Sequence, residues 1–342
     1  MTQAVVTFSD VDIVFGEHPE RAVPMIDAGA SRAEIQEKTG QILGVAGASF
    51  DIREGELIVL MGLSGSGKST LLRAVNGLNR VTRGEVLVRH GDQSVNPSSC
   101  TAEELRSLRR SRIAMVFQQF ALLPWRSVRE NVGFGLELSG MAPKARRAKV
   151  DAQLELVGLA DWGDKYVHEL SGGMQQRVGL ARAFATDAPI LLMDEPFSAL
   201  DPLIRDHLQD ELLALQEKLN KTIVFVSHDL DEAAKIGSRI AIMEGGRVIQ
   251  LGTPQEIVQK PATDYVAEFV AHMNPLGVLR ARDIMRPLNG VAPSADAPRC
   301  AARTPVREVI ALRRAASGPL VVEDKGTPVG LVDEADILDC LR

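Results

Sequence analysis

Cysteine is scarce in this sequence, with only Cys100, Cys300 and Cys340 among 342 residues, far apart and without a CxxC pair. Neither a disulfide framework nor a zinc site is therefore expected, and we predict three reduced, structural thiols. Long apolar runs are missing as well, since uncharged stretches such as 113–125 fall short of the roughly 18 residues that a membrane span requires. We expect no transmembrane helix in this chain.

Basic charge is in deficit, with 39 Lys and Arg against 45 Asp and Glu, and the formal net charge is −6. This balance argues against a nucleic-acid-binding protein, which normally presents a basic face.

Residues 1–12 lack a basic stretch followed by an apolar one, so no signal peptide is predicted and a cytoplasmic location is expected. Hydrophobic residues make up 45% of the chain, as in globular proteins, and the length suits two domains of roughly 100–200 residues each.

Three short, continuous apolar runs, 57–61, 190–193 and 222–226, are typical of strands buried on both faces of a parallel sheet. Helical stretches separate them, so the sequence predicts an α/β fold with its chemistry at the carboxyl ends of parallel strands. The runs lead directly into a glycine-rich turn, into Asp194-Glu195 and into Ser227-His228-Asp229.

An insertion at residues 17–46 interrupts the first part of this pattern. It contains Ser31 and Glu34 at the spacing of a capping box, which predicts a short helix over 33–38 that stops at Gly40. By itself, this segment indicates a structural elaboration of the surrounding domain.

The C-terminal residues 276–342 carry strand, turn and helix signals of their own. A strand is predicted at 319–322, a turn at 325–328, and Asp333 is the expected N-cap of a final helix. We therefore expect a first domain over 1–275 and a second, small domain after it.

Residues 62–69 satisfy the pattern GxxxxGK[ST] directly after a predicted strand and at the start of a helix. In such a loop, backbone N–H groups surround phosphate oxygens, Lys68 reaches the β- and γ-phosphates, and the Ser69 hydroxyl binds Mg²⁺. The predicted nucleotide-binding residues are Gly62, Leu63, Ser64, Gly65, Ser66, Gly67, Lys68, Ser69 and Thr70.

Two acids follow the strand at 190–193. Asp194 is the expected carboxylate of the Mg²⁺ shell. Glu195 can orient or polarise the water that attacks the γ-phosphate. A P-loop alone would fit a kinase or a GTPase equally well, so another motif must decide the class.

The segment 170–177, Leu-Ser-Gly-Gly-Met-Gln-Gln-Arg, resembles the signature of the ATP-binding subunits of ABC transporters, and the motifs follow that family's order from Val5 to about Met273. The resemblance implies a P-loop ABC ATPase cassette with a RecA-like core, an antiparallel β subdomain and a helical signature subdomain. It also implies a head-to-tail homodimer in which the signature of one subunit closes over ATP on the other. The signature residues are Leu170, Ser171, Gly172, Gly173 and Gln175.

Further residues match the family's motifs one by one. Gln118 matches the Q-loop glutamine, which touches Mg²⁺ and the attacking water, and Asp201 matches the D-loop aspartate at the dimer interface. His228 matches the switch histidine at the γ-phosphate, and Phe15 occupies the place of the aromatic that stacks on adenine. The implied catalytic residues are Glu195, His228 and Gln118, and the implied Mg²⁺ ligands are Ser69, Gln118 and Asp194.

The apolar stretch 120–126 follows the Q-loop. At that place it resembles the surface on which a cytoplasmic coupling helix of a transmembrane subunit docks. Ordinary core packing is the alternative for its individual residues.

The stretches 15–19, 36–40, 61–67, 197–205 and 223–232 resemble the ATPase subunits of glycine betaine, proline betaine and choline importers. The insertion then marks this subgroup. The resemblance implies that the chain uses ATP and Mg²⁺ to power import of a quaternary amine, as a peripheral subunit on the cytoplasmic face of the inner membrane. It implies a permease and an extracytoplasmic substrate-binding protein as partners, and no nucleic acid.

The C-terminal stretches 281–285, 319–323, 328–333 and 337–338 resemble one CBS motif. Osmoregulated members of the subgroup carry two such motifs, so regulation by ionic strength or by a nucleotide is not expected here. The single motif either pairs with its copy in the homodimer or is a structural appendage. This reduced domain favours choline over glycine betaine as the cargo.

Two other functions remain open. One is an import ATPase for another solute, such as an amino acid. The other is a soluble ABC ATPase that acts on nucleic acid or ribosomes, although such proteins usually carry coiled-coil insertions or two cassettes, and this chain has one P-loop and no sustained heptads.

Overall fold

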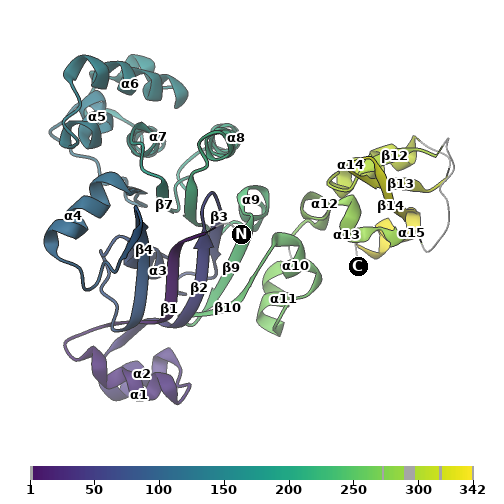
Figure 1. The fold of residues 1–342 in the computed structure, drawn as a ribbon, viewed down its shortest axis with the longest axis horizontal. Coiled ribbons are helices and arrows are strands. Elements are labelled where there is room, and N and C mark those ends of the chain that lie inside the picture. The colour runs from purple at the N-terminus through teal and green to yellow at the C-terminus, as the bar shows by residue number, and fades with distance from the viewer. Residues whose placement is uncertain (1–2, 272, 289–296, 316–317, 341–342) are drawn as a thin grey trace. The chain divides into compact units, whose positions relative to one another are not determined.

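The computed structural model describes residues 3–271, 273–288, 297–315 and 318–340. The chain forms two compact units, one of residues 1–228 with 241–249 and the other of residues 229–240 with 250–342 (Figure 1). The predicted domain boundary between 275 and 276 falls within the second unit and stays a prediction. Within the described residues, no helix is both long and apolar enough to cross a membrane.

The central sheet has six strands in the order β10-β9-β3-β8-β7-β6. Pairing is parallel between β3 and β8, between β8 and β7, and between β7 and β6, which confirms the predicted parallel α/β core. Every residue of β3, β7 and β8 is buried, as expected for strands covered on both faces. The strands are β3 (Leu57–Met61), β6 (Ile113–Val116), β7 (Ile190–Asp194), β8 (Thr222–Val226), β9 (Arg239–Glu244) and β10 (Arg247–Gly252).

A second sheet has four antiparallel strands in the order β2-β1-β4-β5. It provides the antiparallel β subdomain that the family resemblance implies. Its strands are β1 (Ala4–Phe15), β2 (Ile42–Arg53), β4 (Arg83–His90) and β5 (Gln93–Val95).

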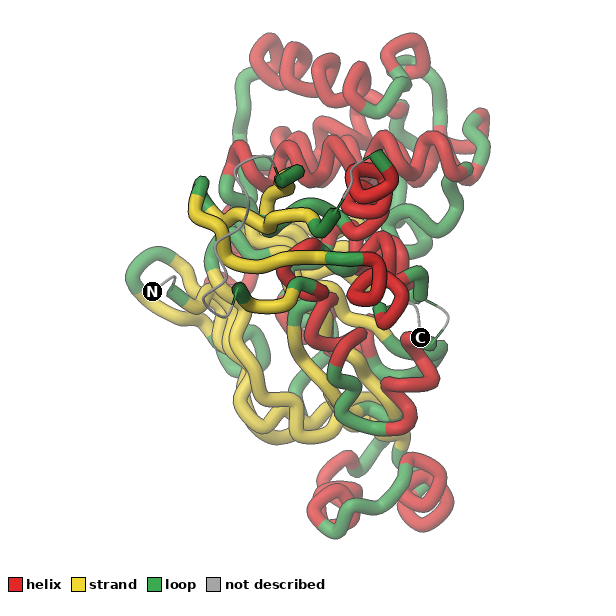
Figure 2. Tube along the Cα trace, turned by 90° about the vertical axis from the view of Figure 1, so that its right-hand side faces the viewer, coloured by secondary structure: helices red, strands yellow, loops and turns green. Residues whose placement is uncertain are grey.

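A helical region completes the first unit. Helix α5 packs against α6 and α7, and α6 also packs against α7. Figures 1 and 2 place α5 and α6 at the opposite end of this unit from α1 and α2. The longer helices of the unit are α3 (Lys68–Val75), α4 (Ala102–Ser111), α5 (Val128–Leu138), α6 (Pro143–Leu156), α7 (Gly172–Ala185) and α8 (Pro202–Leu219), with single turns at Ala160–Trp162 and Val167–Glu169.

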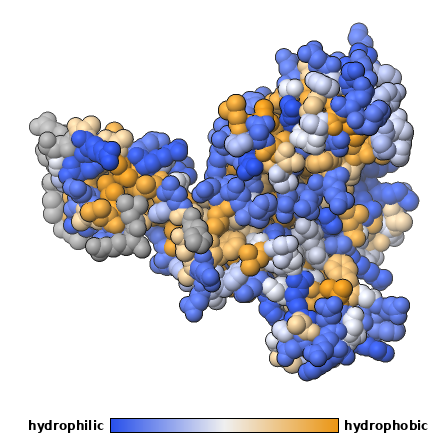
Figure 3. Space-filling view, turned by 180° about the vertical axis from the view of Figure 1, so that it is seen from behind, coloured by the Kyte–Doolittle hydropathy of each residue, from blue (hydrophilic) through white to orange (hydrophobic). Residues whose placement is uncertain are grey.

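The insertion folds into a small lobe of its own, with a turn at Pro19–Ala22, α1 (Val23–Asp27) and α2 (Arg32–Thr39). Ser31 and Glu34 form the predicted capping box, and Gly40 ends the helix with φ 70. Ile26 and Ile35 are buried in a local apolar cluster with β1 and β2. The outer surface of the lobe, at the bottom of Figure 3, is mostly hydrophilic.

The second unit contains a four-stranded sheet in the order β11-β14-β13-β12. Strands β12 and β13, which precede and follow α14 in the sequence, pair in parallel, and β13 and β14 form a hairpin. Asp333 caps the last helix, as predicted. The elements of this unit are α9 (Leu230–Ile236), α10 (Pro254–Gln259), α11 (Asp264–Val270), α12 (Pro275–Val278), α13 (Ala281–Ile284), β11 (Arg286–Pro287), β12 (Arg299–Ala301), α14 (Val306–Arg314), β13 (Leu320–Asp324), β14 (Thr327–Val332) and α15 (Glu334–Asp339).

An apolar core holds the end of the chain together. It includes Cys300, Val309, Leu320 and Val332. All three cysteines are free thiols, as predicted, and burial raises the pKa of the Cys300 thiol above its usual value. The likeness of residues 276–342 to a single CBS motif stays a prediction.

Candidate active site

Four strands of the central sheet deliver the predicted catalytic residues to one edge. The P-loop follows β3, Gln118 follows β6, Asp194 ends β7 and His228 follows β8. Because parallel strands end at the same edge of a sheet, these residues meet there. A cavity of about 510 Å³ opens at this place, and it is lined by Arg32, Ser64, Gly65, Gly67, Lys68, Ser69, Thr70, Gln118, Glu195 and His228.

The P-loop takes a conformation that only glycine tolerates at two points. Gly62 has φ 142, and a Cβ atom there would lie 2.1 Å from the carbonyl oxygen of Met243. Gly67 has φ 103, and its Cβ would lie 2.4 Å from the carbonyl oxygen of Gly44. The Oγ atom of Ser66 is buried without a hydrogen-bond partner in the described part of the chain, which is consistent with a ligand at this loop.

Lys68 is almost fully buried, with 6% of its surface exposed. Its Nζ donates hydrogen bonds to the carbonyl oxygens of Gly62 (2.8 Å) and Leu63 (2.9 Å). Burial lowers the pKa of this ammonium group, while the charges of Glu195 and Asp194 act in the opposite direction. Lys68 therefore brings a buried amino group, held by two backbone carbonyl oxygens, to the place where phosphates are predicted to bind.

Asp194 lies at the end of β7 with no exposed surface. Its Oδ1 accepts a hydrogen bond from Ser69 Oγ at 2.6 Å, and its Oδ2 pairs with Arg73 Nη2 at 2.8 Å. A carboxylate, a hydroxyl and the nearby amide oxygen of Gln118 are hard oxygen donors, so the donor set fits Mg²⁺. The arginine partner was not predicted from the sequence.

Glu195 takes the left-handed backbone conformation, with φ 48, which is strained for a residue with a side chain. Its Oε2 lies 3.3 Å from Gln118 Nε2 and 3.5 Å from His228 Nδ1. Buried Gln176 supports this turn, because its Nε2 donates to the carbonyl oxygen of Glu195 (3.2 Å) and its Oε1 accepts from the amide of Ala199 (3.0 Å). The three predicted catalytic side chains therefore lie together.

The signature lies elsewhere on the same unit. Ser171 is the exposed N-cap of α7 and accepts a hydrogen bond from the Met174 amide at 3.3 Å. The side chain of Gln175 turns inward and donates to the carbonyl oxygens of Val167 and Leu170, both at 3.2 Å. Of the described residues that line the phosphate cavity, none belongs to the signature.

The two other predicted residues, Asp201 and Phe15, do not line the phosphate cavity. Asp201 is the N-cap of α8 and accepts from the Ile204 amide at 3.1 Å. Phe15 ends β1, has 40% of its surface exposed, and lies against Gly44. Its ring is available to a ligand, although Phe15 is not part of the cavity lining.

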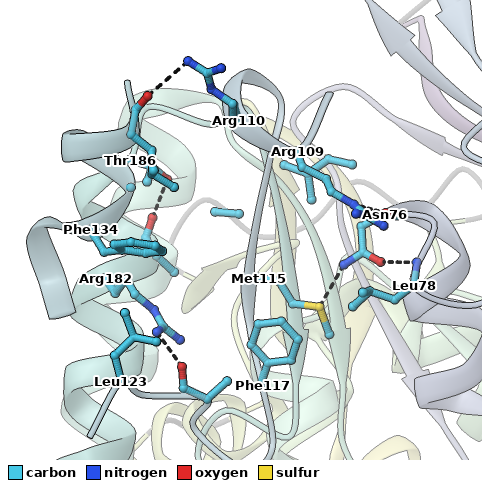
Figure 4. A pocket seen from close by; sticks show the side chains of 16 residues that line it. Asn76, Leu78, Arg109, Arg110, Met115, Phe117, Leu123, Phe134, Arg182 and Thr186 are labelled. Atoms are coloured by element: carbon cyan, nitrogen blue, oxygen red, sulfur yellow. Dashed lines mark hydrogen bonds between the residues drawn. The ribbon is translucent and has the colours of Figure 1, made fainter. Parts of the chain in front are cut away.

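The segment after Gln118 borders a second cavity, of about 400 Å³. Phe120 and Ala121 both have positive φ angles, 59 and 47. Arg182 of α7 donates hydrogen bonds to both carbonyl oxygens, at 2.9 Å and 2.7 Å. Figure 4 shows Arg182, Leu123 and Phe117 around this space. Trp125, two residues after Leu123, has 71% of its surface exposed.

Three residues that support or line the site were not predicted from the sequence, namely Arg32, Arg73 and Gln176. Arg182, which holds the neighbouring segment 120–126, was not predicted either. Gln176 lies within the quoted signature segment, so its position was a signal that could have been used. Arg32 had no such signal, because it belongs to the insertion and reaches the cavity only through the fold.

Comparison with known proteins now decides the family. Residues 45–198 match the ABC transporter family. The glycine betaine/proline betaine transport system ATP-binding protein ProV of Salmonella typhimurium is 55% identical over 273 residues, which cover 80% of this chain and 67% of that protein. The chain belongs to the ABC transporter ATP-binding proteins. It is therefore an ABC-type ATPase that binds and hydrolyses ATP.

Two further relatives define the extent of the likeness. The trimethylamine N-oxide transport system ATP-binding protein TmoW of Ruegeria pomeroyi is 42% identical over 342 residues, covering 100% of this ABC ATPase and 98% of that protein. A solved dimeric ATP-binding cassette in a post-hydrolysis state with ADP and Pi is 31% identical, with a TM-score of 0.63, and the match covers 73% of this chain and 98% of that one. These likenesses confirm the predicted cassette fold and the predicted nucleotide chemistry.

Proposed function

We propose that this ABC ATPase powers the import of a small quaternary amine through a membrane permease. The proposal that the chain hydrolyses ATP to drive import rests on one observation: Gln118, Glu195 and His228 line the same cavity as the P-loop. The cargo class is supported by the relatives named for glycine betaine and proline betaine transport, at 55% identity in Salmonella typhimurium and 54% in Escherichia coli.

In the proposed mechanism, the P-loop amides and Lys68 bind the β- and γ-phosphates. Ser69, Asp194 and Gln118 would hold Mg²⁺, which would neutralise negative charge on the phosphate oxygens. Glu195 accepts a hydrogen bond from the attacking water and polarises it. Gln118 and His228 both lie within 3.5 Å of Glu195 Oε2, so they can fix the carboxylate and the water in one geometry.

The active form in this proposal is a head-to-tail homodimer. Ser171 and Gly172 are exposed at the start of α7, a helix of 14 residues, and do not line the cavity of their own chain. A second subunit could therefore present its signature to ATP held here. The likeness to a cassette solved as a dimer supports this arrangement. ATP binding would close the dimer and hydrolysis would allow it to reopen.

The proposed permease contact lies at the cavity beside 120–126. Leu123, Phe117 and Phe134 contribute apolar surface there, and Arg182 holds the strained segment in place. An apolar cavity with a charged rim suits a short cytoplasmic helix of a membrane protein. The subunit would then lie at the cytoplasmic face of the inner membrane, with a substrate-binding protein delivering the amine from the other side.

The C-terminal residues are proposed to form a single CBS-like motif. The parallel pair β12 and β13 around α14, followed by the β13–β14 hairpin and α15, supports a small α/β module. Its core is built from its own residues, including Cys300 and Leu320. We propose an appendage or a contact between the two copies in the homodimer, without an osmotic switching role.

Uptake by cells tests the cargo. The gene is deleted, and the initial uptake of labelled glycine betaine, choline and trimethylamine N-oxide is measured at low and high salt. We expect uptake of a quaternary amine to fall, and to return with the wild-type chain but not with the Glu195→Gln variant. Choline uptake that falls at both salts supports the choline prediction, whereas loss of glycine betaine uptake at high salt alone favours an osmoprotectant importer.

Trimethylamine N-oxide is included because a relative named for its transport matches this chain from end to end. It is an amine oxide, not a quaternary ammonium compound with four carbon substituents. If only its uptake falls, the quaternary-amine assignment is wrong, although the import function stands. If no uptake changes, the cargo assignment fails and the ATPase assignment remains.

A further inference from the structure

Arg32 lines the phosphate cavity although it comes from the insertion. It is the first residue of α2 and lies outside residues 45–198, which match the ABC transporter family. Its side chain nevertheless borders the same space as Lys68 and Ser69. The general cassette pattern therefore does not account for this cation.

The guanidinium is held by backbone carbonyl oxygens of β2 and of the P-loop. Its Nε donates to the carbonyl oxygen of Leu43 at 2.6 Å, and Nη2 lies 3.4 Å from that of Gly44. Its Nη1 donates to the carbonyl oxygen of Gly65 in the P-loop. These contacts use three of the five N–H groups of an arginine, so two remain for a ligand.

No carboxylate within the described residues pairs with Arg32, and burial alone lowers the pKa of its guanidinium. The nearest acid along the chain on its helix, Glu34, is engaged by the amide and hydroxyl of Ser31. An arginine side chain stays charged even when it is partly buried in a protein. A half-buried cation without a counter-ion is unfavourable, and an anion in the cavity would compensate it.

We propose that Arg32 is a nucleotide-binding residue supplied by the insertion, and that its guanidinium contacts the phosphate chain of ATP beside the P-loop. The inference deepens the ATP site described above and rests on it. Guanidinium groups recognise phosphate by charge-assisted hydrogen bonds. Gly44, whose carbonyl oxygen Arg32 contacts, lies next to Phe15 and Thr70, so the guanidinium lies near both the proposed adenine contact and the P-loop.

The lobe is built to hold Arg32 in position. The Ser31–Glu34 capping box orients the first turn of α2, and Ile35 anchors the helix in the local core. Arg83 ties the lobe to β4 through two hydrogen bonds to Asp27, at 2.7 Å and 3.0 Å. A preorganised cation loses little freedom when the nucleotide binds.

The test measures the dissociation constants of ATP and ADP by calorimetry on the full-length chain, in EDTA so that no hydrolysis occurs. The variants are Arg32→Ala, Arg32→Gln and Arg32→Lys. The matched control is Arg21→Ala, which removes an exposed arginine of the same lobe. We expect Arg32→Ala and Arg32→Gln to weaken ATP binding by about tenfold or more, Arg32→Lys to recover part of this loss, and Arg21→Ala to bind like the wild type.

The glutamine and lysine variants separate phosphate binding from a purely structural tether. Glutamine can still donate to backbone carbonyls but carries no charge, so a tether predicts wild-type affinity for Arg32→Gln. That result, or equal losses in Arg32→Gln and Arg32→Lys, would overturn the proposal even if Arg32→Ala were poorly folded. The loss should also shrink at high salt, as expected for an electrostatic contact. A wild-type chain that binds no ATP would instead refute the nucleotide function itself.

Discussion

At the residue scale, the proposed catalytic acid Glu195 is held in a defined geometry by its neighbours. Its carboxylate lies near Gln118 and His228, while its backbone adopts φ 48. Non-glycine residues rarely keep such a conformation unless their surroundings impose it. Here the amide of Gln176 and the Ser198 hydroxyl both donate to the Glu195 carbonyl oxygen, at 3.2 Å and 3.1 Å, and so they help to impose it.

The Glu195→Gln variant should retain ATP binding and lose turnover. The amide has the same size but cannot accept a proton or polarise water as a carboxylate does, so we expect the hydrolysis rate to fall by about 100-fold or more. Single-turnover hydrolysis and the dissociation constant of ATP check the two parts of this prediction. Hydrolysis at the wild-type rate would refute the role assigned to Glu195.

At the element scale, helix α7 connects the separate parts of the catalytic unit. Its N-terminus carries the exposed Ser171, its second turn carries Gln176 beside the Glu195 turn, and its last turn carries Arg182 beside the segment 120–126. A rigid helix with these three contacts can transmit a change at one of them to the others. This geometry links the proposed dimer contact to the proposed permease contact.

Arg182→Ala should uncouple that link. The carbonyl oxygens of Phe120 and Ala121 would lose a charged donor, at a cost of about 1–3 kcal/mol in the free energy of unfolding. We expect amide hydrogen exchange in 120–126 to become faster, and transport to fall more than the ATPase activity of the isolated subunit.

Arg177→Ala is the matched control for this change. Arg177 lies on the same helix, and its Nη1 donates to the carbonyl oxygen of Val157 at 3.0 Å, away from 120–126. Burial lowers the pKa of both guanidinium groups. If both variants accelerate exchange in 120–126 equally, Arg182 has no specific role in holding that segment.

At the scale of the whole molecule, the separation of the signature from the cavity on one chain makes the dimer testable. In the Glu195→Gln background, ATP should drive dimer formation that light scattering detects. Adding Ser171→Arg should abolish this dimer without releasing ATP from the P-loop, because a large cation would occupy the helix N-terminus. Ser111→Arg places the same residue on the exposed face of α4 and should leave the dimer intact. ATP-driven dimers in the Ser171→Arg variant would contradict the proposed assembly.

Deletion of 279–342 should leave basal ATP hydrolysis intact. Every described residue that lines the phosphate cavity lies at or before His228, and the C-terminal core has its own apolar cluster. The full-length and shortened chains are compared by steady-state hydrolysis at low and high salt, and we expect the same salt response from both. Complete loss of activity in the shortened chain would mean that this segment is required for the fold of the ATPase.

Much of the fold and the site could be predicted because it depends on patterns among residues that are neighbours in the sequence. Apolar runs before Gly62, Asp194 and Ser227 predicted the parallel strands, and the sheet then places their ends together. The capping pair Ser31 and Glu34 predicted the start of α2, which the structure confirms. These features depend on neighbouring residues, so pattern and spacing are sufficient for them.

Contacts between residues far apart in the chain depend on how the folded elements pack. Arg73 pairs with Asp194, Gln176 supports Glu195, and Arg182 holds the segment after the Q-loop. Arg32 reaches the P-loop only because the insertion folds against β2. The order of the amino acids specifies which chemical groups the chain possesses and the order in which the strands present them. The packing determined which charges and carbonyl oxygens those groups meet, because long-range hydrogen bonds depend on the distances that the folded backbone sets.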